Sequence, residues 1–142
     1  MKKSPFLFLI LLTFSVLSCS KKQDVPVEGL EVQLEVVSGC GVVKKVSLNK
    51  AKTVKDLTGN RCEKSSKKEH YETDSAKYQQ LLAHIQKLDL FRADYKDCWR
   101  CADGVDYMLV ISTGDGLRNE LSISRQRTEQ DLVSFMALLD EL

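Results

Sequence analysis

The sequence predicts an α+β domain in which an antiparallel sheet of about four strands is covered by two helices. Two regions each contain a pair of alternating apolar and polar runs around a glycine-containing turn, the pattern of a hairpin. Each is followed by a segment with apolar residues at helical spacing. The predicted order is ββαββα. Half-buried antiparallel strands need a cover for their apolar face, and two amphipathic helices supply it.

The first hairpin is predicted from residues 30–37, which read LEVQLEVV. Leucine and valine alternate there with glutamate and glutamine, as in a strand with one buried face. The next residues, 38–41, contain two glycines that can adopt the positive φ of a turn. A weaker alternation over residues 42–48 predicts the returning strand.

The middle of the chain, Asn49 to Tyr71, is polar and rich in lysine. Within it, only residues 53–57 are expected to pair with the hairpin as a further short strand. Asp74 or Ser75 is then predicted to cap a helix. The apolar stripe of this helix comprises Tyr78, Leu81, Leu82, Ile85 and Leu88, with Leu90 and Phe91 packing near its end.

The second hairpin is predicted over residues 105–124. Its two strands alternate on either side of the turn signal Thr113-Gly114-Asp115-Gly116. Thr128 is predicted to cap a last helix, with Asp131 at the acidic position of a capping box. The apolar stripe of that helix comprises Leu132, Phe135, Met136, Leu139 and Leu142.

The first 18 residues have the pattern of a secretory signal peptide. Lys2 and Lys3 precede the apolar run FLFLILLTFSVL at residues 6–17. That run is shorter than the roughly 20 residues that a membrane-spanning helix needs. A buried first helix of the domain is the alternative, but such a helix would have a polar face, and this run is apolar all round.

The residues Val16-Leu17-Ser18-Cys19 resemble the lipobox of bacterial lipoproteins. The resemblance implies that the Cys19 thiol takes a diacylglyceryl group, that the leader is cut before Cys19, and that the new amino group is acylated, commonly with palmitate. Because Ser20 rather than aspartate follows the cysteine, the resemblance also implies the outer membrane, facing the periplasm. A plain signal peptide with an incidental cysteine is the alternative.

Processing would leave a tether at residues 19–29 and one domain at residues 30–142. The acyl chains expected on Cys19 would hold this domain at a membrane, because two or more chains bind stably. Removing Lys2 and Lys3 from the 21 basic residues leaves 19, against 20 acidic ones. This balance argues against nucleic acid as a partner. A cluster of lysines is expected to form a solvated strand face and loop, with contact to lipid headgroups as the alternative. It comprises Lys44, Lys45, Lys50, Lys52, Lys55, Lys64, Lys67 and Lys68.

The other four cysteines form an even set, which in an exported protein predicts two disulfides. The favoured pairing is Cys98 with Cys101 and Cys40 with Cys62. The first two are close in sequence, and the second two flank one hairpin and its following loop. Cross-pairings that join the two halves of the domain are the alternative.

The segment Cys98-Trp99-Arg100-Cys101 also raises the hypothesis of thiol–disulfide chemistry. Thioredoxin-like sites place such a pair at the start of a helix, whereas a strand is predicted to follow here. A four-cysteine zinc site needs two close pairs, and Cys40 and Cys62 are too far apart to be the second. Haem attachment needs a histidine where Ala102 stands. A short disulfide before the second hairpin is the favoured interpretation.

Four aspartates near this segment could gather around calcium: Asp94, Asp97, Asp103 and Asp106. Their spacing does not match a known calcium loop, so a solvated turn is favoured. His70 and His84 are isolated, and no phosphate-binding loop or hydrolase motif is present. No catalytic residue, metal or cofactor is therefore predicted.

The run Cys98-Trp99-Arg100-Cys101-Ala102-Asp103-Gly104, between a helix and a strand pair, resembles a group of small envelope lipoproteins of Bacteroidota-type bacteria. The resemblance covers residues 75–142. In that group a second glycine and an aromatic residue often follow, whereas Val105 and Asp106 stand here before Tyr107. It implies a location and a fold, and no activity.

Together these patterns predict a lipid-anchored envelope protein with a non-catalytic binding or structural role. Its expected partners are membrane lipid, through Cys19, and an envelope protein. The alternative is an extracytoplasmic redox protein that uses Cys98 and Cys101. Inhibition of a periplasmic enzyme is a third hypothesis, which would need an exposed apolar patch.

Overall fold

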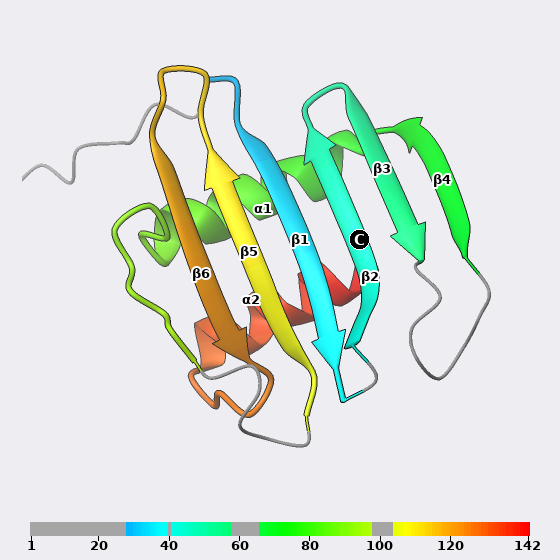
Figure 1. Ribbon diagram of the computed structural model, residues 1–142. Coiled ribbons are helices and arrows are strands. Elements are labelled where there is room, and N and C mark those ends of the chain that lie inside the picture. The colour runs from blue at the N-terminus through cyan, green and yellow to red at the C-terminus, as the bar shows by residue number, and fades with distance from the viewer. Residues whose placement is uncertain (1–27, 40, 58–65, 98–103) are drawn as a thin grey trace, which may run out of the picture.

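The computed structural model describes residues 28–39, 41–57, 66–97 and 104–142. These residues form a six-stranded antiparallel sheet and two helices (Figure 1). The elements in chain order are β1 (Glu31–Ser38), β2 (Gly41–Asn49), β3 (Lys52–Leu57), β4 (Lys67–Glu72), α1 (Ser75–Lys87), β5 (Asp106–Ser112), β6 (Arg118–Ser124) and α2 (Gln130–Glu141).

The α+β class, both predicted hairpins and the short third strand are confirmed, but the prediction of four strands in the order ββαββα is wrong. The observed order is ββββαββα, because residues 67–72 form β4 beside β3. β4 reads KKEHYE and is exposed along most of its length. It therefore lacks the alternation of apolar and polar residues by which a half-buried strand is recognised.

The strand order across the sheet is β4-β3-β2-β1-β5-β6. The two predicted hairpins are joined through β1 and β5, which pair with Leu34 opposite Leu109. The connection through α1 carries the chain from the edge strand β4 across to β5, next to the opposite edge strand β6. Both helices lie on the same face of the sheet (Figure 1).

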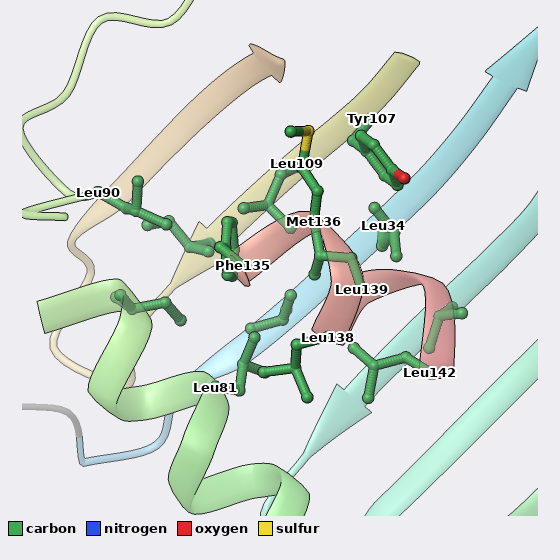
Figure 2. Close-up of a cluster of buried hydrophobic side chains, with 14 of the residues drawn as sticks. Leu34, Leu81, Leu90, Tyr107, Leu109, Phe135, Met136, Leu138, Leu139 and Leu142 are labelled. Atoms are coloured by element: carbon green, nitrogen blue, oxygen red, sulfur yellow. The ribbon is translucent and has the colours of Figure 1, made fainter. Parts of the chain in front are cut away.

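The core fills the space between the helices and the sheet. Phe135 and Leu139 of α2 pack with Leu81 of α1 over Leu34 and Leu109 of the sheet, and all five are at most 1% exposed (Figure 2). The predicted apolar stripes of both helices thus face the sheet. Neither α1 nor α2, the helices of the described residues, covers the opposite face of the sheet (Figure 1).

The first helix begins as predicted, but the second begins one residue later than expected. The Asp74 side chain accepts hydrogen bonds from the backbone N–H groups of Ala76 and Lys77, as an N-cap does. The N-cap of α2 is Glu129 rather than Thr128. The predicted capping box is absent, since no described side chain caps this end of α2 and Asp131 is the second rather than the third residue after the cap. The Asp131 carboxylate instead accepts a hydrogen bond from Lys87 of α1 at 2.7 Å.

Lysines from two other elements lie at the C-terminal end of α2. Lys44 Nζ donates to the carbonyl oxygens of Leu139 and Asp140 at 3.1 and 3.0 Å, and Lys77 Nζ donates to that of Glu141 at 3.2 Å. Cations at this end of a helix stabilise its unpaired carbonyls and its dipole. The expectation of a fully solvated lysine face is therefore wrong for Lys44, which is half-buried, and burial lowers its pKa.

Neither α1 nor α2 combines the length and the apolar character that a membrane-spanning helix requires. This finding concerns the described residues alone.

Candidate functional site

The candidate site is the sheet face opposite the two helices, which we call the open face. Val32 and Leu34 of β1 point to the helices and are buried, so Gln33 and Glu35 of the same strand point to the open face. The same alternation holds in β2, β3 and β5. The open face therefore consists of the strand residues whose side chains point away from the core.

The strand register aligns these residues in rows that cross the sheet. One row runs from β4 to β5 and comprises Lys68, Asp56, Lys45, Glu35 and Met108. Its first four members alternate in charge. Directly opposed residues on one face lie close enough to interact, so the alternation keeps each charge beside an opposite one. Within this row, Lys45 Nζ and Glu35 Oε1 form an ion pair at 2.6 Å.

The neighbouring row comprises His70, Val54, Ser47, Gln33 and Val110. From β4 to β5 it carries no charged carboxylate or ammonium group, and in β6 it continues to Glu120. The two rows therefore place an uncharged stripe beside a charged one on the same surface.

A shallow groove of ≈ 380 Å³ lies where these two rows meet. Its apolar lining includes Val54, Met108 and Val110, each partly exposed, and charged side chains from β1 to β4 surround them. Apolar groups with a few charged and hydrogen-bonding groups around them are typical of a binding surface. The groove brings together residues from β1, β2, β3, β4 and β5.

Sequence reasoning did not identify this groove. Its residues occupy the polar positions of alternating strands, which look like ordinary solvated positions. One signal was present in β5, whose sequence DYMLVIS is apolar on both faces. Met108 and Val110 could have marked an open face that is not wholly polar.

The two histidines lie on different elements of the described structure. His70 is exposed on β4, whereas His84 lies on α1 with its ring 5.7 Å from that of Phe135. Nδ1 of His84 is buried without a hydrogen-bond partner. Within the described ranges, histidine, aspartate and glutamate side chains form no group of three that could hold a metal ion.

The cysteines Cys19, Cys40, Cys62, Cys98 and Cys101 lie outside the described residues. The lipid anchor and both disulfides therefore stay predictions. The described residues after Cys98 and Cys101 begin with Gly104 and lead into β5. A strand thus follows the cysteine pair, as the argument against a thioredoxin-like site expected.

The predicted aspartate cluster has a structural explanation for Asp97. Both carboxylate oxygens of Asp97 accept hydrogen bonds from Arg127, at 2.7 and 2.8 Å, and one also accepts the Ser124 N–H at 2.8 Å. The guanidinium of Arg127 lies over the Tyr95 ring, 5.3 Å from its centroid. Arg127 holds the pKa of the Asp97 carboxyl below its usual range. Asp97 therefore fastens its segment to β6 instead of facing solvent.

Of the other three aspartates, the structure describes Asp94 and Asp106. Asp94 is exposed, with Lys96 at 3.9 Å, and Asp103 lies outside the described residues. Asp106 begins β5 and is 2% exposed, and its Oδ1 has no hydrogen-bond partner among the residues that the structure describes. The expectation of a solvated turn is therefore wrong for Asp97 and Asp106.

No protein-family model matches the chain. No curated protein matches it either.

Proposed function

We propose that this chain is a lipid-anchored envelope protein that binds another envelope protein through its open face, without catalysing a reaction. The observation that carries the binding role is the uncovered sheet face with its groove of ≈ 380 Å³. The anchor rests on Cys19 and its lipobox-like surroundings. The proposed location is the outer membrane, with the domain in the periplasm.

A protein partner suits the groove better than a small molecule does. The groove is shallow and spans several strands, whereas sites for small ligands enclose most of the ligand surface. Its partly exposed apolar residues, Val54, Met108 and Val110, can be covered by apolar side chains of a partner. The surrounding charges of Glu35, Lys45 and Asp56 can form a polar rim.

The proposed disulfides are compatible with the placement of their neighbours. Gly39 and Gly41, which flank Cys40, are at one end of the sheet. Leu57, where the chain leaves β3, lies at the same end, since Lys45 of β2 is opposite Asp56. Val37 opposite Asp106 brings the start of β5 there too. A pairing of Cys40 with Cys62 therefore needs no rearrangement of the described strands.

Substitution of Cys19 by alanine is expected to abolish acylation and release the protein from the membrane fraction, because the thiol that carries the lipid is removed. The measurement is metabolic labelling with radioactive palmitate, followed by fractionation and mass spectrometry of the purified chain. Labelled wild type that lacks residues 1–18 supports the anchor. Unlabelled wild type, or a chain that still carries residues 1–18, contradicts it.

Val110→Arg is expected to reduce partner recovery at least tenfold when the tagged, full-length protein is isolated from native envelopes. A charged side chain in the apolar part of the groove would have to be desolvated against the partner. Val133→Arg is the matched control, because Val133 is 40% exposed on α2, on the other side of the molecule. Both variants should keep the wild-type circular dichroism spectrum.

Two outcomes would contradict the binding role of the open face. One is a partner that both variants recover as well as wild type does. The other is a partner that Val133→Arg loses and Val110→Arg keeps.

A further inference from the structure

The two edges of the sheet differ in how their backbone groups are used. The outer edge of β6 is covered by the segment that precedes Cys98. There the Ser122 N–H donates to the Tyr95 carbonyl at 2.8 Å, and the Asp97 N–H donates to the Ser122 carbonyl at 3.0 Å. The outer edge of β4 has no strand beside it among the described residues. An open edge of this kind offers unpaired N–H and C=O groups to another strand.

The charges along β4 are complementary to those of a second copy of the same strand that runs antiparallel to it. Its sequence runs from Lys67 and Lys68 through Glu69, His70 and Tyr71 to Glu72. The positive end of one copy therefore lies opposite the negative end of an antiparallel second copy. Lys68 and Glu72 are available for this role, because neither makes an ion pair within the described ranges.

Symmetry restricts the register. A two-fold axis perpendicular to the sheet keeps the open faces of both copies on one side, so only residues of the same face can oppose each other. Lys68, His70 and Glu72 share the open face, since their β3 neighbours Asp56, Val54 and Lys52 do. The register centred on His70 places each Lys68 opposite the other copy's Glu72. The registers centred on Glu69 and on Tyr71 do not form this pair.

We propose that β4 pairs antiparallel with β4 of a second copy, in the register centred on His70. The dimer would continue the sheet across both copies and join their open faces into one surface. Lysines on an edge strand normally repel other strands. In the register centred on His70, Lys68 instead faces Glu72 of the second copy, so the charges attract. The proposal does not rest on the lipid anchor or on partner binding at the groove.

Charge reversal tests the register in the full-length chain, by sedimentation velocity in detergent over a range of concentrations. Lys68→Glu and Glu72→Lys each place like charges opposite one another twice, so each should raise the dimer Kd by roughly tenfold or more. The double variant exchanges the charges and should restore dimerisation to near the wild-type level. Lys50→Glu, at an exposed position outside β4, is the control and should leave the Kd unchanged.

Cysteine cross-linking provides a second measurement that does not depend on charge. In the proposed register the two His70 Cα atoms lie about 4.5–5.5 Å apart, within the range that a disulfide spans. With diamide as the oxidant, which accepts the two electrons and two protons of the thiols, His70→Cys should form a cross-linked dimer beyond the wild-type level. Tyr71→Cys should form less, because Tyr71 opposes Glu69.

The proposal is overturned if the wild-type chain stays monomeric at its highest soluble concentration. It is also overturned if the double variant dimerises no better than either single variant, or if His70→Cys cross-links no more than wild type or Tyr71→Cys. Failure of the dimeric wild-type chain to recover any envelope partner would count against the groove and leave this inference intact.

Discussion

Replacing Phe135 by alanine is expected to lower the free energy of unfolding by about 3–5 kcal/mol. Phe135 lies on α2, and its fully buried ring packs between α1 and the sheet (Figure 2). Its removal leaves a cavity that the surrounding side chains fill only in part, and it takes away the ring that lies against His84. Domains of this size have total stabilities of about 5–15 kcal/mol, so the variant should be close to unfolding.

Urea denaturation followed by far-ultraviolet circular dichroism measures this effect. Val133→Ala is the matched control on the same helix, because Val133 is 40% exposed. It should change stability by no more than about 0.5 kcal/mol. Similar losses in the two variants would show that the core is not organised around α2 as described.

Arg127→Met is expected to cost about 1.5–3 kcal/mol, because it removes two hydrogen bonds to a carboxylate that is only 19% exposed. It should also loosen the segment 95–97, whose place along β6 depends on Asp97. Hydrogen exchange at the amides of Asp97 and Ser122 should become faster. Arg118→Met is the control, since its ion pair with Glu120 is exposed and should contribute about 0–1 kcal/mol.

The same pair predicts how this loss depends on pH. Because Arg127 lowers the pKa of Asp97, the folded chain binds a proton at this site less readily than the unfolded chain. The contribution is therefore complete above about pH 3.9, the ordinary aspartate value, and disappears as the pH falls through the lowered pKa. The stability difference between wild type and Arg127→Met should shrink over that acidic range. A difference that stays constant would exclude the pair as its source.

Sequence patterns were reliable where one face of an element is buried and the other is not. The alternation in β1 and the stripe from Tyr78 to Leu88 report this asymmetry directly, and both elements are present. β4 was not predicted as a strand because it is held by backbone pairing with β3 alone, while its side chains are largely exposed. The start of α2 was misplaced by one residue because Thr128 and Asp131 have capping-box spacing, whereas the helix begins after Glu129.

The candidate groove depends on register and on which face the helices cover. Neither is encoded in any single strand. Lys45 and Glu35 are ten residues apart in sequence, but their pairing follows from the alignment of β1 with β2. The sequence groups Asp97 with other aspartates, whereas in the structure Arg127, which follows β6, lies beside it. Tertiary contacts of this kind override local composition.

The central position of β1 affects how the domain can fold. Strands β1 to β4 pair with neighbours in sequence, so a four-stranded meander can form early. Its apolar side nevertheless stays open to water until β5, α1 and α2 are added. Contacts between residues distant in sequence slow folding and prolong the exposure of apolar surface that can aggregate. We therefore expect a slow final step and a need for chaperone protection before it.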